Sequence, residues 1–239
     1  MSSVISIREV NKSFGKKTIL SNLNLEINKG EIYAIVGNNG AGKTTLLRMI
    51  CGQLKPNGGE IVFSDNKTKI GTLIESPGYF KDMTAYDNLK AKALCLGYKY
   101  SKQQLLDLLE FVSLKDVDKK KAGKFSMGMK QRLGIALALL GDPEILILDE
   151  PTNSLDPQGI NEVRKLIEKI NKEKGVTIII SSHILEELYK VATKFCIIHK
   201  KGIIKEIAID ALKEECKDMP IDEYYLKTLE EYDKNEANT

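Results

Sequence analysis

The residues with the clearest chemical capability form one stretch, GNNGAGKT, at positions 37–44. Its glycines let the backbone turn N–H groups toward an anion, because no side chain stands in the way. Lys43 adds a mobile positive charge, and the Thr44 hydroxyl can ligate Mg²⁺. The spacing predicts a phosphate-binding loop, with the nucleotide contacted by Gly37, Asn38, Asn39, Gly40, Ala41, Gly42, Lys43, Thr44 and Thr45.

Such a loop needs a strand before it and a helix after it. Ile32–Val36 is a short apolar run typical of a buried strand, and residues 45–50 are predicted to form a helix. The start of that helix would present N–H donors and a positive dipole end to the same anion. The alternative, a glycine-rich turn that fits the pattern by chance, is less favoured in this setting.

A pair of carboxylates, Asp149 and Glu150, follows the apolar strand predicted over 144–148. Successive side chains at a strand end point in different directions. Asp149 can therefore hold Mg²⁺ through water while Glu150 orients or deprotonates an attacking water. The alternative is an ordinary strand terminus, which a phosphate-binding loop in the same chain makes less favoured.

Two element ends and one aromatic residue are further candidates. Ser126 and Gly128 open a predicted helix, so that end is itself an anion site. His183 follows the strand predicted over 176–180 and can donate to a phosphate, although a lone histidine is more often structural. Phe14, in a predicted loop, has two equally favoured roles: stacking on adenine or filling the core.

The remaining pattern predicts the elements that position these residues. Residues 4–10 and 18–27 alternate as two half-buried strands of a largely antiparallel sheet. Residues 84–113 have helical periodicity, with Ser101 as an N-cap, and a long amphipathic helix after Pro157 ends at Gly175. Ser181 and Ser182 are predicted to open another helix, and a hairpin closes the domain.

The predicted class is therefore α/β: a core around the phosphate-binding loop, an antiparallel subdomain at the N-terminus and an inserted helical subdomain over roughly residues 76–140. One domain covers residues 1–210. Residues 211–239 form a charged tail, helical or partly disordered, whose final few residues are expected to be disordered.

Composition excludes several classes. Lys plus Arg is 36 against 33 for Asp plus Glu, a net charge of +3, which gives no argument for nucleic acid as a partner. The run at 119–121 is expected to be a solvated loop. Four cysteines fit neither a zinc site nor a disulfide framework, so buried reduced thiols are expected. No signal peptide or membrane span is recognisable, which predicts a soluble chain.

Taken in order, these motifs resemble the ATP-binding subunit of an ABC transporter, over roughly residues 1–210. Residues 37–44 match the Walker A motif, and 145–149 match the Walker B motif with Glu150 as the catalytic glutamate. Residues 126–132 match the family signature and 154–156 its D-loop. His183 is similar to the switch histidine and Phe14 to the adenine-stacking aromatic.

This resemblance implies an ATPase that uses ATP and Mg²⁺ and drives a separate transmembrane permease. The chain would be cytoplasmic, peripheral on the inner face of the cell membrane. It implies a homodimer in which two head-to-tail copies enclose the nucleotides. The implied catalytic residues are Lys43, Glu150 and His183, the metal residues Thr44, Asp149 and Glu75, and the residues that reach the second copy's nucleotide Ser126, Gly128 and Asp156.

The sequence departs from the family pattern in the signature and at Glu75. Phe125, Met127 and Met129 replace Leu, Gly and Gln of the signature. Glu75 stands where the family has a Gln that touches Mg²⁺ and the attacking water. With a glutamate at this position the chain resembles a subgroup of the family, the exporters that protect bacteria from lantibiotics and bacitracin-like peptides. The alternative is a solvated loop residue that has drifted from Gln.

Another class also fits part of the pattern: a soluble ABC ATPase without a permease, acting in repair, translation or cofactor assembly. Translation-type members usually carry two ATPase domains, and this chain has one phosphate-binding loop. Repair-type members carry coiled-coil insertions, and no sustained heptads are present. A GTPase is disfavoured because no [NT]-K-x-D motif occurs. An ABC exporter of another substrate stays open.

Overall fold

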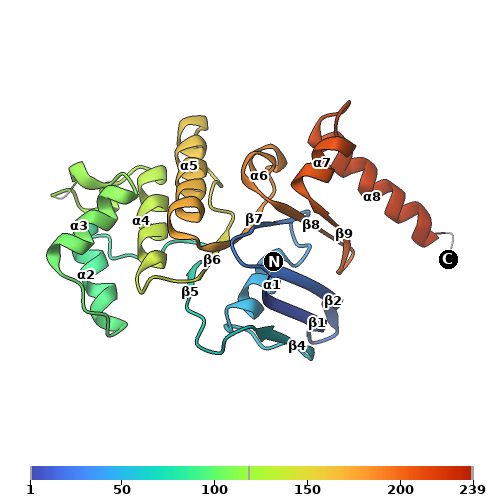
Figure 1. Ribbon diagram of the computed structural model, residues 1–239, viewed down its shortest axis with the longest axis horizontal. Coiled ribbons are helices and arrows are strands. Elements are labelled where there is room, and N and C mark those ends of the chain that lie inside the picture. The colour runs from blue at the N-terminus through green and yellow to red at the C-terminus, as the bar shows by residue number, and fades with distance from the viewer. Residues whose placement is uncertain (1, 118, 238–239) are drawn as a thin grey trace. The chain divides into compact units, whose positions relative to one another are not determined.

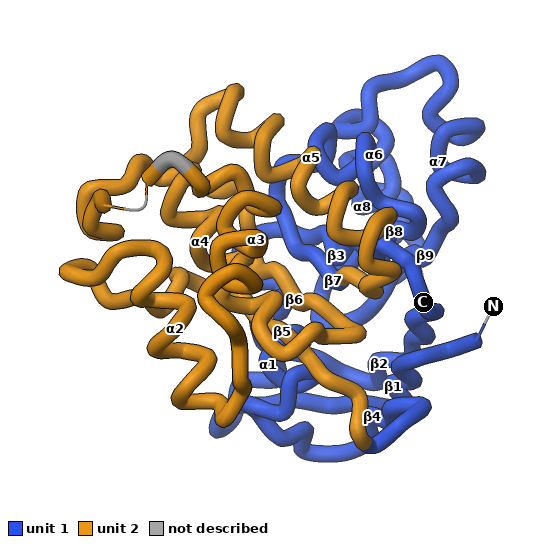
Figure 2. Tube along the Cα trace, turned by 60° about the vertical axis from the view of Figure 1, so that its left-hand side comes forward, with its two compact units in different colours: residues 1–66, 179–239 blue, residues 67–178 orange. Residues whose placement is uncertain are grey.

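The computed structural model describes residues 2–117 and 119–237. The chain divides into two compact units (Figure 2): unit 1 comprises Met1–Asn66 and Ile179–Thr239, and unit 2 comprises Lys67–Ile178. Unit 1 contains the phosphate-binding loop, residues 37–44. Unit 2 contains Glu75, the signature and the carboxylate pair.

The first sheet of unit 1 is antiparallel. It has the order β2-β1-β4, formed by Ser3–Phe14 (β1), Lys17–Asn28 (β2) and Gly58–Phe63 (β4). Apolar residues alternate toward one face, so Ile7 pairs with Leu25 on one side and with Ile61 on the other. The two N-terminal strands predicted from alternation are confirmed, and both are longer than predicted.

The second strand group of unit 1 leads into the phosphate-binding loop. β3 (Ile32–Val36) buries every residue and pairs in parallel with β8 (Lys194–His199), which pairs antiparallel with β9 (Gly202–Ala208). Within this buried group Tyr33 donates to Glu206 over 3.0 Å, and Lys194 is ion-paired with the same carboxylate. The hydroxyl of the buried Tyr33 is thus satisfied by a carboxylate of β9, which β8 separates from β3 in the strand order.

Four helices complete unit 1 (Figure 1): α1 (Lys43–Ile50), α6 (Leu185–Val191), α7 (Ile209–Glu215) and α8 (Ile221–Ala237). α8 packs on α6 and buries Ile221, Tyr224, Tyr225 and Leu229. The tail is therefore helical through residue 237, and its last two residues, 238 and 239, lie outside the described part. The predicted helix start at Ser181 is wrong, because Ser181 and Ser182 are buried in β7 (Thr177–Ser182).

Unit 2 has a short parallel strand pair and most of the helices. β5 (Ile70–Leu73) pairs with β6 (Ile145–Asp149), and the helices are α2 (Ala85–Cys95), α3 (Lys102–Phe111), α4 (Met127–Leu139) and α5 (Pro157–Lys174). Two 3₁₀ turns, Lys115–Val117 and Ala122–Lys124, separate α3 from α4. The α/β class with helices inserted between two strands is confirmed. Ser101 forms the predicted cap, a full capping box, and Gly175 ends α5 at φ 64°.

α4 packs unusually close to the segment around β5. A Cβ atom at Gly71 would lie 2.1 Å from the Ala138 carbonyl oxygen, and one at Gly134 would lie 2.6 Å from Pro77 Cβ. Glycine is required at Gly71 for the two backbones to approach this closely, and at Gly134 for the Pro77 ring to lie against the helix. The loop that follows β5 and carries Glu75 is consequently held directly against α4.

The cysteines differ from the expectation in one case. Cys196 and Cys216 are buried and Cys51 is half-buried, but Cys95 is exposed at the end of α2. The prediction of buried thiols is therefore wrong for Cys95. None of the helices described over residues 2–117 and 119–237 combines the length and apolarity of a membrane span.

Candidate nucleotide site

Glycines shape the phosphate-binding loop at two points where any side chain would collide. A Cβ atom at Gly37 would lie 2.6 Å from the Ile198 carbonyl oxygen of β8. Gly42, at φ 103°, precedes α1, and a Cβ there would lie 2.6 Å from a Leu20 methyl carbon. The loop is thus pressed against β8 on one side and β2 on the other, and the predicted strand, loop and helix are all present.

Lys43 points into the loop. Its side chain is buried, and its ammonium donates to the carbonyl oxygens of Gly37 over 2.7 Å and of Asn38 over 3.4 Å. Gly42, the N-cap of α1, has no side chain to cap the helix, and the described first turn contains no acidic residue. The positive end of α1 is therefore not neutralised by a carboxylate of its own helix.

This donor set fits a nucleotide triphosphate. Turning glycines, an ammonium and the start of a helix are chemically suited to phosphate oxygens. Within the described residues no group of three or more His, Cys, Asp or Glu side chains is arranged to hold a metal.

Phe14 ends β1 and is 53% exposed, so the core-filling alternative is wrong. The Lys12 ammonium lies 5.1 Å from the centre of the ring while donating to the Lys55 carbonyl over 2.7 Å. The ring is therefore open to a planar group from outside the protein. Stacking on adenine stays a prediction.

His183 and Tyr225 are the other polar candidates of unit 1. His183 directly follows β7 and its side chain is exposed, in agreement with the predicted strand end. The Tyr225 hydroxyl donates to Asn38 Oδ1 over 3.2 Å, which brings α8 to the phosphate-binding loop. No local pattern identified Tyr225, because its partner lies 187 positions earlier.

The candidate carboxylates of unit 2 follow β5 and β6. Asp149 ends β6 and is 3% exposed, while Glu150 is half-buried with φ 49°. Glu75 is exposed with φ 65°. Non-glycine residues rarely adopt positive φ, and such strain gathers at functional sites. Glu75 and Glu150 share this feature with seven other described non-glycine residues, so a role for Glu75 and the alternative of a solvated loop residue both stay open.

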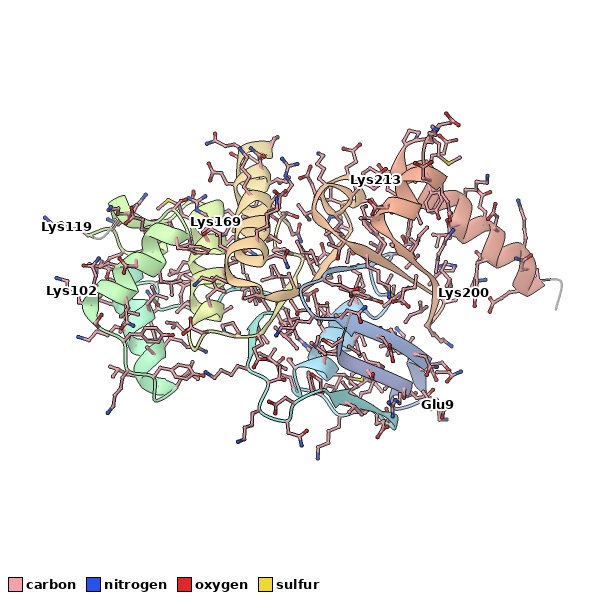
Figure 3. The ribbon with its side chains drawn as sticks, in the orientation of Figure 1. Glu9, Lys102, Lys119, Lys169, Lys200 and Lys213 are labelled. Atoms are coloured by element: carbon pink, nitrogen blue, oxygen red, sulfur yellow. The ribbon has the colours of Figure 1, made fainter. Side chains whose placement is uncertain are left out.

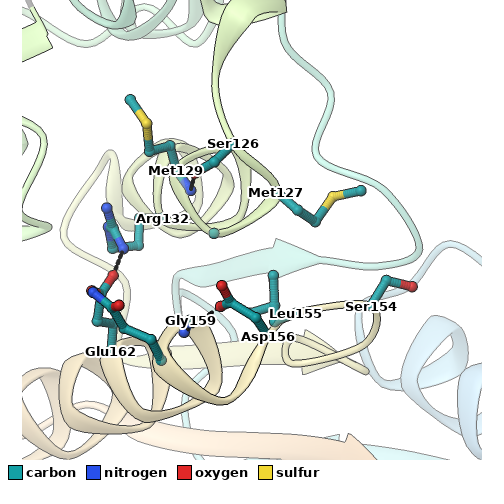
Figure 4. Close-up of a pocket in the computed structure, with 11 residues that line it drawn as sticks. Ser126, Met127, Met129, Arg132, Ser154, Leu155, Asp156, Gly159 and Glu162 are labelled. Carbon is teal, nitrogen blue, oxygen red and sulfur yellow. Dashed lines mark hydrogen bonds and ion pairs between the residues drawn. The ribbon is translucent and has the colours of Figure 1, made fainter.

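The signature and the D-loop lie on one cavity of about 490 Å³ between α4 and α5 (Figure 4). Ser126 caps α4 by accepting from Met129 N over 3.3 Å, and Asp156 caps α5 by accepting from Gly159 N over 2.8 Å. Two helix N-termini therefore open on the same space, which is suited to an anion. The predicted opening of α4 at Ser126 is confirmed.

An ion pair between Arg132 of α4 and Glu162 of α5 closes one end of this cavity. Gln158 also donates to Glu162, over 2.9 Å. The Arg132 side chain is 11% exposed, and among the described buried polar atoms its Nε has no hydrogen-bond partner. The pair thus fixes α4 to α5, a contact that the sequence pattern did not predict.

The methionines that replace signature residues point apart (Figure 4). Both line the cavity, Met127 being 51% exposed and Met129 pointing away from Met127. A Cβ atom at Gly128 would lie 3.8 Å from its nearest neighbours, Arg132 and Gly159. The requirement for glycine at this position is therefore not imposed by packing within unit 2.

Unit 1 thus contains Phe14 and the phosphate-binding loop, and Tyr225 is hydrogen-bonded to that loop. Unit 2 brings together Ser126, Gly128 and Asp156. A family model described as ABC transporter matches residues 20–153. The chain belongs to the ABC transporter family. It is an ATP-binding cassette, and in this family ATP hydrolysis is coupled to transport.

Two curated relatives of this ABC protein are 45% identical to it. The bacitracin transport ATP-binding protein BcrA of Bacillus licheniformis aligns over 90% of this chain and 72% of its own length. The lantibiotic transport ATP-binding protein SrtF of Streptococcus pyogenes aligns over 87% of this chain and 92% of its own.

Solved structures of ATP-binding cassettes have the same fold. CbiO1 from Clostridium perfringens, part of the ABC transporter complex cbiONQ, has a TM-score of 0.80 at 28% identity and covers 90% of this chain and 92% of its own. The cassette MJ0796, in a dimeric post-hydrolysis state with ADP and Pi, has a TM-score of 0.75 at 25% identity, covering 86% and 98%.

Proposed function

We propose that this ABC ATPase drives a separate membrane permease that exports an antimicrobial peptide of the lantibiotic or bacitracin-like class, and so protects the cell. The observation that carries the proposal is the 45% identity to two transport ATP-binding proteins named for bacitracin and a lantibiotic. The glutamate at position 75 gives the chain a resemblance to the same subgroup of exporters. The chain then acts at the inner face of the membrane, with no nucleic acid as partner.

The proposed chemistry follows from the residues of each motif. The phosphate-binding loop holds the triphosphate through backbone N–H groups and the Lys43 ammonium. Thr44 and Asp149 are the residues that would hold the Mg²⁺ that accompanies ATP, and the ion would supply charge neutralisation to the phosphates. Glu150 takes a proton from the attacking water as ADP and phosphate form, and His183 donates a hydrogen bond to the phosphate.

The second copy of the chain supplies the other half of each site in this proposal. Ser126, Gly128 and Asp156 of one copy contact the nucleotide held by its partner. Support comes from the two capped helix ends that share one cavity, and from the absence of a packing reason for Gly128 within unit 2. The dimeric MJ0796 cassette is a precedent for such an assembly.

Resistance assays test the exported class. The chain, co-expressed with the permease genes that neighbour its own, is expected to raise the inhibitory concentration of bacitracin or of a lantibiotic in a sensitive bacterium. Lys43→Ala should abolish the protection, and Lys29→Ala, at an exposed turn, should retain it. An assembled transporter that hydrolyses ATP but protects against neither peptide class would refute the peptide assignment and leave the ATPase assignment intact.

Glu75 is proposed to couple nucleotide state to the permease. Its carboxylate lies on the loop packed against α4, in a strained backbone conformation. Glu75→Gln and Glu75→Ala should therefore lower peptide resistance more than they lower ATP binding. Asp82→Asn, an exposed carboxylate on the same connection, is the control. Unchanged resistance and unchanged ATPase rate in both Glu75 variants would show that Glu75 has no such role.

A further inference from the structure

The C-terminal helix α8 reaches the phosphate-binding loop through one side chain. Tyr225 is buried, and its hydroxyl donates to Asn38 Oδ1 over 3.2 Å. Burial raises the pKa of the Tyr225 hydroxyl above its ordinary value, so the group stays protonated and can donate. Asn38 is the second residue of the loop, directly after Gly37.

Asn38 is linked to the groups that would bind phosphate. Its carbonyl oxygen accepts from Ala41 N over 3.0 Å and from Lys43 Nζ over 3.4 Å. The same ammonium donates to the Gly37 carbonyl over 2.7 Å. For Lys43 to reach a phosphate oxygen it must exchange these carbonyls for the ligand. The position of Asn38 therefore bears on how much that exchange costs.

Hydrogen bonds and ion pairs near both ends of α8 connect it to the β8–β9 hairpin and to α7. Near its start, the Tyr224 hydroxyl donates to Glu215, which also binds Lys205, each over 2.6 Å. Near its end, Asp233 pairs with His199 Nε2 and Lys200 Nζ, each at 2.9 Å. Lys200 lies in the turn between β8 and β9, below α8 in the view of Figure 3.

The same hairpin also packs against the phosphate-binding loop. Ile198, which precedes His199, is the residue whose carbonyl lies against Gly37. α8 is thus fixed to the strand that supports the first residue of the loop and bonded to the side chain of the second. A shift of α8 would act on the loop at both positions.

We propose that Tyr225 is a positioning residue for the phosphate-binding loop, so that docking of α8 and binding of the nucleotide favour each other. This inference rests on nucleotide binding at residues 37–44. Because binding linkage is reciprocal, a docked α8 should strengthen nucleotide binding by the factor with which nucleotide strengthens docking. Tyr225 has no role in the chemical step itself.

The test compares two Tyr→Phe changes on α8 in the full chain. Tyr225→Phe keeps the buried ring and removes the hydroxyl that reaches Asn38. Tyr232→Phe removes a hydroxyl that donates to Glu236 over 3.2 Å on the same helix, and it is the matched control. Loss of one such hydrogen bond should weaken MgATP and MgADP binding, measured by calorimetry, about 2- to 10-fold in Tyr225→Phe and not in Tyr232→Phe.

Two further measurements separate positioning from simple stability. KM for ATP should rise in Tyr225→Phe while kcat is unchanged, and in an Asn38→Ala background Tyr225→Phe should have no additional effect. Amide exchange over residues 221–229 should slow on adding MgADP in the wild type and much less in Tyr225→Phe.

Each outcome decides between the two proposals. Wild-type affinity in Tyr225→Phe, or an effect that persists in the Asn38→Ala background, would overturn the role of Tyr225. A lower melting temperature with unchanged affinity would show a structural role only, and would overturn it too. A wild-type chain that binds neither MgATP nor MgADP would instead overturn the proposed function.

Discussion

Gly128 and Gly134 allow a matched experiment, because both lie on α4 and Gly→Ala adds the same methyl group to each. At Gly128 that carbon would lie 3.8 Å from its nearest neighbours, which is an ordinary van der Waals contact. At Gly134 it would lie 2.6 Å from Pro77 Cβ and 3.0 Å from a Leu73 methyl carbon. The first position has room within unit 2, and the second has none.

Opposite effects on stability should follow. Gly128→Ala should raise the free energy of unfolding by about 0.4–1 kcal/mol, because alanine restricts the unfolded chain at a compatible helical position. Gly134→Ala should lower it by about 1–3 kcal/mol, since the Pro77 ring cannot rotate away. For a chain of this size the second change lowers the melting temperature by roughly 2–12 °C.

ATP hydrolysis should nevertheless be impaired in the stable variant, Gly128→Ala. If Gly128 faces the nucleotide of a second copy, its added methyl group should reduce ATP turnover at least about tenfold, which corresponds to roughly 1.4 kcal/mol of lost contact. Urea unfolding gives the stability, and ATP hydrolysis over a protein concentration series gives the activity. A stable Gly128→Ala variant with wild-type turnover would refute the reasoning, as would a Gly128→Ala variant as unstable as Gly134→Ala.

Three other predictions concern the carboxylates and the thiols. Glu150→Gln should still bind ATP but lose turnover by about 10²- to 10⁴-fold, and gel filtration should show an ATP-bound dimer; normal turnover would remove Glu150 from its role. Burial raises the pKa of Cys196 to about 12, so iodoacetamide should label exposed Cys95 in the folded chain and Cys196 only after denaturation, as mass spectrometry would show. Hydrogen bonds from Lys200 and then from His199 lower the pKa of Asp233. The Asp233 carboxylate therefore stabilises the fold above its unfolded-state pKa, and this stabilisation is lost as the pH falls through the lower folded-state pKa. Amide exchange in α8 should accelerate only below about pH 4. The acceleration should be smaller in Asp233→Asn, which has no carboxylate to protonate.

The elements around the phosphate-binding loop could be predicted because their signals are local. Strand, glycines and helix follow one another within residues 32–50, and the caps at Ser101 and Gly175 depend on residues within one helical turn. The opening of α4 at Ser126 is local in the same way. Each of these follows from hydrogen bonds between near neighbours in the chain.

The predictions that failed concern residues whose structure depends on contacts between distant parts of the chain. Ser181 and Ser182 are common helix starters, yet burial in β7 outweighs that preference. The sequence around Phe14 favours the core and adenine stacking equally, and only the exposure of the side chain excludes the core. Tyr225 was missed because its contact joins residues 187 positions apart. Tertiary contacts of this kind leave no periodic trace in the sequence.

The close approach of α4 to the segment around β5 has a mechanical consequence. The Ala138 backbone lies against the backbone at Gly71, and the Pro77 ring lies directly against Gly134, so the segment around β5 contacts this helix with little space between them. Side-chain rotation cannot absorb a displacement where backbones touch, because packed interiors transmit strain. A displacement of the loop that carries Glu75 would therefore also displace α4, including the end of the helix that begins after Ser126.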